Sequence, residues 1–211
     1  CMAFYRCEGP EMYRSIGETE CVTDLARKSM SGRYGSTKVA AGIVAFVDLQ
    51  IGQLVDEILI AHKEAAGGRL RGIRHAAAFL NDPNVNNSHT NPQRDMFLDL
   101  QFREGFKSLI QHELSFDAWI YHPQIPQLTD LAKTFPEATI ILDHLGGPLG
   151  IGPFSNKREE VYAVWKRDMK ELSGCQNVNV KLGGLGMKMC GFGYHKMEDP
   201  PSSDMLARDW Q

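Results

Sequence analysis

The sequence has 211 residues, of which 43% are hydrophobic and 23% charged, and its net charge is −3. These values are ordinary for a globular protein, and we expect one domain over residues 1–211 with a sizeable buried core. No apolar run approaches the roughly 20 residues of a membrane span, and no signal peptide is visible. No basic cluster appears either, so neither a membrane nor nucleic acid is an expected partner. The composition leaves a homo-oligomer open.

The five cysteines are an odd number and include no C-x-x-C pair. Dispersed free thiols are typical of a reducing compartment, so we expect a cytoplasmic protein. The chain opens without an initiator methionine and closes inside an expected helix, and we therefore expect an internal fragment of a longer protein. The cysteines are Cys1, Cys7, Cys21, Cys175 and Cys190.

The first half of the chain alternates strand-length apolar runs with segments of helical periodicity. Residues 39–49 are a near-continuous apolar run, as expected of a buried strand. Residues 52–66 place apolar side chains at helical spacing and stop at Gly67 and Gly68, a typical helix end. In chain order we predict a strand end at residues 1–5, a helix at 20–30, a strand at 39–49, a helix at 52–66, a strand at 69–77 and a loop at 81–92.

The second half continues the same alternation. Residues 96–113 carry apolar side chains on one broad helical face, and Pro136 ends a second helix. The chain closes with a loop and a helix that we expect to be capped near Ser202 or Ser203. Before that, we predict helices at residues 96–113, 126–135 and 158–174, which alternate with strands at residues 115–122, 138–145 and 177–186.

The order of these elements indicates an α/β fold. The strands are apolar without strict alternation, which is typical of parallel strands buried on both faces and linked by helical crossovers. An open doubly wound sheet and a closed (β/α)8 barrel both fit this order. We count six strands, so a barrel would lack two.

Polar side chains follow four of the expected strands directly. In a barrel, the carboxyl ends of the strands carry the catalytic groups, and these side chains would therefore converge on one mouth. Asp143 and His144 adjoin on one strand, so a regular strand would point them to opposite faces. We expect His144 to face the mouth together with His122, while Asp143 turns away to hold backbone or a cationic side chain. The strand-end residues are Arg74, His75, Tyr121, His122, Asp143, His144 and Lys181.

Each of these residues also has a purely structural interpretation. Asp143 would cap a turn, and a half-buried histidine would bond a backbone carbonyl. Arg74 and Lys181 would pair with neighbouring carboxylates. Three histidines that all follow strands make this interpretation weaker for the set than for any single residue. We expect the other four histidines, on helices or loops, to be solvated; these are His62, His89, His112 and His195.

Four segments, taken in order, carry a family likeness: RGIRH, YHPQ, ILDHLGGP and NVNVKLGGLG. Together they resemble the amidohydrolase-related family of metal-dependent hydrolase barrels, which includes sugar-lactone and dicarboxylate lactonases and related decarboxylases. The likeness covers residues 71–186 best, and its most specific motif is the Asp-His pair followed by glycines at residues 143–148.

The resemblance implies an incomplete (β/α)8 TIM barrel that contains strands two to seven and lacks the first and last. It places His122 and His144 at or beside the family's metal position, as catalytic residues and as tentative ligands. One divalent metal is implied, zinc first, although some lactonases of the family work without metal. The aspartate that the family uses to activate water would lie on the eighth strand, outside this chain.

The resemblance further implies a hydrolase that opens the lactone ring of a small carboxylated or sugar-derived, anionic substrate. His144 would polarise the carbonyl or move a proton. We assign substrate binding to Arg74, whose guanidinium suits a carboxylate, and to His75, Tyr121, Tyr5, Arg6 and Lys181. A metal-dependent decarboxylase on the same barrel and a non-catalytic binding protein on a decayed barrel are the alternatives.

Overall fold

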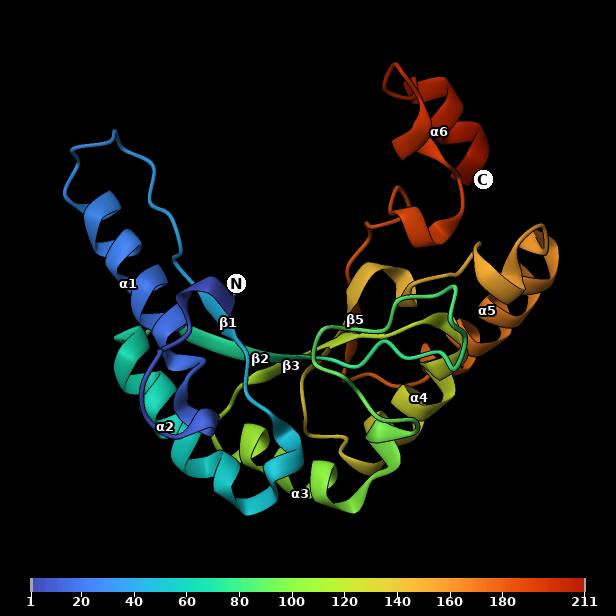
Figure 1. Cartoon of the computed structure of the whole chain (residues 1–211). Coiled ribbons are helices and arrows are strands. Elements are labelled where there is room, and N and C mark those ends of the chain that lie inside the picture. Colours follow the sequence, from blue (N-terminus) through green and yellow to red (C-terminus); the bar gives the residue numbers. More distant parts are fainter. Residues whose placement is uncertain (1, 211) are drawn as a thin grey trace. The chain divides into compact units, whose positions relative to one another are not determined.

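The computed structural model describes residues 2–210, and its helices and strands alternate as the sequence predicts (Figure 1). The strands are β1 (Ile43–Ala45), β2 (Leu70–Ala76), β3 (Ser115–Trp119), β4 (Ile140–Leu142) and β5 (Val178–Val180). The helices are α1 (Ile16–Met30), α2 (Val55–Ala66), α3 (Leu100–Gln111), α4 (Ile125–Thr134), α5 (Arg158–Leu172) and α6 (Ser203–Trp210).

The strands follow one another in the sheet in chain order, β1-β2-β3-β4-β5. The pairs β1–β2 and β4–β5 are parallel, with Ile43 opposite Leu70 and Ile140 opposite Val178. A doubly wound sheet reverses its strand order at a switch point, whereas a barrel adds each new strand beside the last. The order of the five described strands is therefore that of a (β/α) barrel segment.

The structure corrects the prediction for the first residues. Met2–Phe4 form a 3-10 turn instead of a strand end, so five strands, not six, lie within residues 2–210. The backbone N–H of Tyr5 donates to the carbonyl of Met2, and Arg6 donates to Arg14, so the chain folds back on itself. A short apolar segment forms a strand only if another strand pairs with it, and among residues 2–6 the local turn takes these backbone hydrogen bonds instead. The predicted strand end also included Cys1, which lies outside the described residues.

The long apolar run at residues 39–49 is also mostly irregular, since only Ile43–Ala45 pair in the sheet. Ala40 has a φ of 50°, and the Asp48 side chain accepts a hydrogen bond from the N–H of Gln50, which begins a 3-10 helix. At the other end of the chain, the N–H of Met205 donates to the Ser202 hydroxyl at 3.2 Å, which confirms the predicted cap.

The chain divides into two compact units. The first unit comprises the residues up to His75, Phe97–Asp117 and Glu137–Thr139. Its core is a cluster of four fully buried phenylalanines, with neighbouring ring centroids 5.2–6.3 Å apart. Edge-to-face and tilted aromatic contacts add to the apolar burial, so this cluster fixes α3 against β3. Its members are Phe97, Phe102, Phe106 and Phe116.

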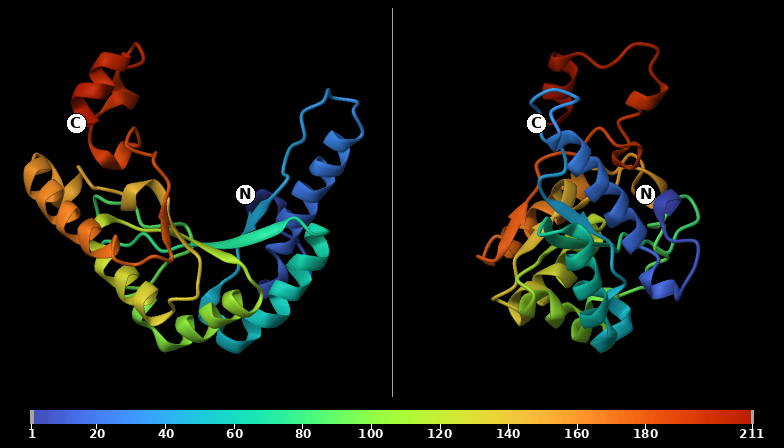
Figure 2. Two further views of the ribbon diagram at one scale, coloured as in Figure 1. Left: turned by 180° about the vertical axis from the view of Figure 1, so that it is seen from behind. Right: turned by 90° about the vertical axis from the view of Figure 1, so that its left-hand side faces the viewer.

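Helices α1 and α2 lie side by side in the first unit, as both views in Figure 2 show. Between them His62 is fully buried, which contradicts the prediction of a solvated histidine. Its Nε2 lies 3.2 Å from the Ser15 hydroxyl and its Nδ1 2.9 Å from the Thr19 hydroxyl. Burial, helped by the nearby positive charge of Arg6 and opposed by Glu20, lowers the pKa of His62 from 6.5 to about 4.

The second unit comprises Ala76–Met96, Ala118–Pro136 and the residues from Ile140 onward. Helices α4 and α5 pack against each other beside the β4–β5 pair (Figures 1 and 2). Lys133 and Glu171 join the two helices at 2.8 Å, and the Asn177 amide before β5 donates to the carbonyls of Ala132 and Phe135 at the end of α4. This unit carries the ends of β3, β4 and β5.

The thiols of Cys7, Cys21, Cys175 and Cys190 are free, as predicted, whereas Cys1 lies outside the described residues. Among residues 2–210, none of the helices combines the length and apolar character that a membrane crossing requires.

We expect His62 to make the protein less stable as the pH falls from about 6.5 to about 4. In this window the unfolded chain binds a proton that the folded chain does not bind, so the free energy of unfolding falls as pH falls. The expected loss is roughly 3 kcal/mol, from about 1.4 kcal/mol per pKa unit. Urea unfolding at several pH values should show a weaker pH dependence for His62→Gln than for the wild type. His89→Gln on the exposed loop is the control, and an unchanged dependence in His62→Gln contradicts the assignment.

Gly105 lets α3 approach the 3-10 helix Leu49–Leu54. A β-carbon at this position would overlap the carbonyl oxygen of Leu49 and lie 2.9 Å from a Val55 methyl group. Gly105→Ala should therefore cost about 1–3 kcal/mol of unfolding free energy by overpacking. Gly186, whose added β-carbon would meet nothing within 4 Å, supplies the matched control variant Gly186→Ala. Equal stability of the two variants in urea unfolding would contradict this packing.

Candidate functional site

The second unit brings together the polar residues that follow β3, β4 and β5. Tyr121 and His122 follow β3, Asp143 and His144 follow β4, and Lys181 follows β5. Parallel strands end at the same edge of a sheet, which is why these groups gather.

Asp143 is fully buried, and its charge is balanced by Lys181. The Lys181 Nζ lies 2.9 Å from Asp143 Oδ1, while about half of the lysine side chain is exposed. The backbone holds the lysine in place as well, because its N–H donates to Leu142 and its carbonyl accepts from Leu145. A buried carboxylate requires such a partner, so the part of the prediction that gave Asp143 a cationic side chain is confirmed.

His144 does not continue the strand. Its φ and ψ are 52° and 45°, and Leu145 follows at 57° and 25°, so both adopt the left-handed conformation inside the 3-10 segment Asp143–Gly146. The premise of a regular strand to its end is therefore wrong, and alternation does not decide where Asp143 and His144 point. Non-glycine residues rarely adopt this conformation, and it is often found at functional sites.

Tight packing holds the His144 side chain. Its ring meets the Trp119 ring edge-on at 5.2 Å, and a β-carbon on Gly184 would lie 2.5 Å from the His144 β-carbon. Within residues 2–210, the buried Nδ1 of His144 has no hydrogen-bond partner. A positioned imidazole nitrogen without a partner is suited to hold or transfer a proton.

Gly147 connects the backbones of the two histidines. Its N–H donates to the carbonyl of His144 at 3.1 Å, and its carbonyl accepts from the N–H of His122 at 3.2 Å. Its φ is 54°, and an added β-carbon would come within 2.5 Å of the Ile120 carbonyl oxygen. Only glycine fits at this point, which explains the glycine pair in the sequence.

His122 is 2% exposed and acts as a hydrogen-bond acceptor. The backbone N–H of Leu149 donates to its Nδ1 at 3.2 Å, and the Phe154 ring packs edge-on at 4.8 Å. Burial lowers the pKa of His122 to about 4, against the opposing charge of Asp168. The imidazole is thus neutral near pH 7 with its proton on Nε2, since Nδ1 is the acceptor.

Gln124 is a positioning residue that the sequence reasoning missed. Its amide accepts from the N–H groups of Tyr121 and Phe79 and donates to the Ala77 carbonyl, at 2.8–3.1 Å. One buried side chain thus joins the loop after β2 to the end of β3. Gln124 is the last residue of the YHPQ segment. An amide side chain soon after a predicted strand was the signal that the sequence offered.

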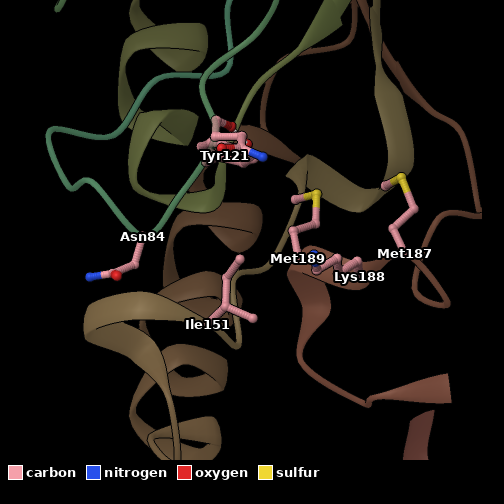
Figure 3. Close-up of a pocket in the computed structure, with 7 residues that line it drawn as sticks. Asn84, Tyr121, Ile151, Met187, Lys188 and Met189 are labelled. Atoms are coloured by element: carbon pink, nitrogen blue, oxygen red, sulfur yellow. Dashed lines mark hydrogen bonds between the residues drawn. The ribbon is translucent and has the colours of Figure 1, made fainter. Parts of the chain in front are cut away.

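A cavity of about 280 Å³ opens beside Tyr121 (Figure 3). Tyr121 is buried, and its hydroxyl donates to the Asn86 carbonyl, while burial raises the pKa of the phenol. The other lining side chains come from loops, and none of them was among the predicted site residues: they are Asn84, Asn86, Ile151, Met187, Lys188 and Met189. No sequence motif identifies these residues, because they come together only when the loops fold against one another.

The remaining predicted site residues belong to the first unit. His75 is 1% exposed, and its Nδ1 accepts from the N–H of Leu49 at 3.3 Å, between the rings of Phe46 and Phe102. Arg74 is half-buried on β2.

Near the start of the chain, Arg6 forms a surface ion pair with Glu20. Tyr5 is half-buried, and burial raises the pKa of its phenol. The substrate-binding roles of Tyr5, Arg6, Arg74 and His75 stay predictions.

The donor side chains of the described residues do not meet the requirements of a catalytic metal ion. A catalytic zinc site uses three protein ligands and an open position. Among residues 2–210, no group of three or more histidine, cysteine or acidic side chains is arranged to hold an ion. The Nε2 proton of His122 also opposes ligation through that nitrogen. The described residues thus do not form a metal site by themselves, and the metal roles of His122 and His144 stay predictions.

Comparison with known proteins gives the family. The sequence profile described as Amidohydrolase matches residues 35–207. The chain belongs to this amidohydrolase family. It is 32% identical over 157 residues to the uncharacterized protein y4mH of Sinorhizobium fredii, covering 69% of this chain and 45% of that protein. It is 28% identical over 193 residues to the L-fucono-1,5-lactonase of Burkholderia ambifaria, covering 87% of this chain and 59% of that protein.

Solved structures agree on the fold. An amidohydrolase from Burkholderia multivorans with bound HEPES matches with a TM-score of 0.56 and 22% identity, over 77% of this chain and 49% of that one. A second crystal form of an amidohydrolase from the same organism, with bound zinc, matches with a TM-score of 0.54 and 23% identity. This match covers 77% of this chain and 50% of that one. The chain thus spans about half the length of the relatives it matches. These similarities show a partial amidohydrolase barrel.

The ion pair between Asp143 and Lys181 can be tested by a double-mutant cycle. Lys181→Met leaves the buried carboxylate without its cation and should cost about 1–3 kcal/mol, less than a fully buried pair because water reaches the lysine. Adding Asp143→Asn should recover part of this loss. Urea unfolding measures the cycle, with Lys196→Met as the exposed control. Purely additive effects of the two substitutions would contradict the pairing.

Proposed function

We propose that this chain is the part of a lactone-hydrolysing enzyme that carries its proton-transfer histidine. The observation that carries the proposal is His144: it is held in a left-handed turn, its Nδ1 has no partner within the described residues, and it adjoins the Asp143–Lys181 ion pair. Membership of the amidohydrolase family supports hydrolysis, and similarity to two L-fucono-1,5-lactonases supports the lactone ring as substrate.

Lactone hydrolysis requires a proton to move. Water adds to the carbonyl carbon, the ring C–O bond breaks, and the proton lost by water ends on the released alkoxide. In the proposal, Nδ1 of His144 takes the proton from one oxygen and returns it to the other. The contacts with Trp119 and Gly184 hold the ring, so the nitrogen stays in one place during both transfers.

Two other residues support the reaction. The ammonium group of Lys181, half exposed beside Asp143, is the cation at the strand ends that can stabilise negative charge on the carbonyl oxygen. His122 is assigned to positioning, because its Nδ1 holds Leu149 and its pKa of about 4 makes it a poor proton acceptor near pH 7. Catalysis by His122 itself stays a prediction.

A structural relative was crystallised with zinc, which keeps a metal within the proposal for the full-length protein. The described residues do not complete a metal site, so no step here passes through a metal. The decarboxylase and binding-protein alternatives also stay predictions. Assays of the full-length protein on lactones and on unsaturated carboxylic acids separate a lactonase from a decarboxylase and from a protein with no activity.

His144→Asn is the sharpest test of the proposed role. Asparagine tolerates the left-handed conformation, so the substitution removes the imidazole and leaves the turn. We expect kcat for lactone hydrolysis by the full-length protein to fall at least about 100-fold, with the melting temperature nearly unchanged. His195→Asn is the matched control. A large loss of melting temperature with turnover retained would show that His144 is structural.

A further inference from the structure

Two of the loops that line the cavity beside Tyr121 pack closely against each other. Gly150 donates its N–H to the Met189 carbonyl at 2.8 Å, and a β-carbon on Gly150 or on Gly191 would overlap the backbone of the other loop. This contact fixes Ile151 relative to Met187 and Met189. The side chains that face the cavity are therefore set by backbone packing.

The inner wall of this cavity is apolar. Tyr121 belongs to a buried cluster with Ala78, Val85 and Leu149, against which Ile151 and Met189 pack. Figure 3 shows both methionines on one segment, and Ile151 on another, around the same space. Thioether and aliphatic groups offer a ligand dispersion contacts and no strong hydrogen bond.

The polar groups of the lining are either engaged or exposed. The Tyr121 hydroxyl already donates to the Asn86 carbonyl, and the Asn84 amide donates to Asp82 at 3.1 Å. Lys188 is exposed, where its charge suits a carboxylate at the outer end of a ligand. A hydroxyl group placed against Ile151 or Met189 would lose its hydrogen bonds to water and gain none.

We propose that this cavity makes the enzyme prefer lactones with an alkyl or aryl ring substituent over polyhydroxylated sugar lactones. The inference rests on the proposed function and adds the substrate class to it. Met187 and Met189 are the specificity-determining residues. The substituent lies against them and Ile151, while the carbonyl that becomes the carboxylate lies at His144 and Lys181, as in the proposed function.

The first experiment compares kcat/KM of the full-length protein for two δ-lactones with the same ring. δ-Octalactone carries a propyl group, and glucono-δ-lactone carries hydroxyl groups. We expect at least about tenfold preference for δ-octalactone, from one well-filled apolar subsite. A preference for glucono-δ-lactone would overturn the inference while leaving lactone hydrolysis intact.

Variants at Met189 locate the preference. Met189→Gln keeps the length of the side chain and adds an amide, so the preference should fall about tenfold. Met189→Leu keeps an apolar wall and should retain it. Met197→Gln, an exposed methionine that does not line the cavity, is the matched control. Melting temperatures show that each variant folds, and an unchanged preference in a folded Met189→Gln protein contradicts the role of Met189.

A binding experiment separates this inference from the proposed function. If no lactone is hydrolysed, the proposed function fails, but the cavity can still be tested with two ethers that are not hydrolysed. Calorimetric titration with a propyl-substituted tetrahydropyran and with anhydroglucitol should show tighter binding of the propyl compound, weakened by Met189→Gln. Equal binding of the two ethers, or binding that Met189→Gln does not change, overturns the inference whatever the catalytic result.

Discussion

The reversal of the chain after β4 is the constraint on which the second unit depends. Four consecutive residues from His144 to Gly147 have positive φ, and two of them are not glycine. Each non-glycine residue in this conformation costs of order 1–3 kcal/mol, so the surroundings must hold it. They do so from several sides: the Trp165 indole donates to the Leu145 carbonyl at 2.7 Å, Leu145 donates to Lys181, and Gly147 bonds both His144 and His122. The turn persists because β5, α5 and the end of β3 all bind its backbone.

This turn also places the loops that line the cavity. His144 packs against Gly184, so the chain after β5 passes close to the imidazole before it reaches Met187 and Met189. The same loop then meets Gly150, three residues after the turn ends at Gly147. The strand ends therefore supply groups that can move a proton, and the loops supply a surface that can recognise a substituent. Both sets are held by the same backbone contacts, but the side chains that face a ligand can change independently.

The sequence predicted the helices and strands where their pattern is local. Helical periodicity located α3, and apolar runs bounded by turns located β3 and β4. The sequence-based prediction failed where contacts with distant residues determine the local structure. CMAFY has the composition of a strand, but Met2–Phe4 form a 3-10 turn and no strand within residues 2–210 pairs with them. His62 lies on a helix face that the packing of α1 buries. The left-handed turn at His144 was also missed, because its backbone is stabilised by residues 20 or more positions away.

The histidines show most clearly what sequence leaves undecided. His75 lies near the end of β2 and His122 follows β3. Both are buried, and in each case Nδ1 accepts a backbone N–H, from Leu49 and Leu149 respectively. Such an imidazole caps a loop, and a free lone pair on that nitrogen is no longer available for chemistry. His144 follows β4, yet its Nδ1 has no partner within residues 2–210. Because all three histidines lie at or just after the end of a strand, residue type and position do not separate them. Their hydrogen-bond partners distinguish a capping histidine from one able to transfer a proton.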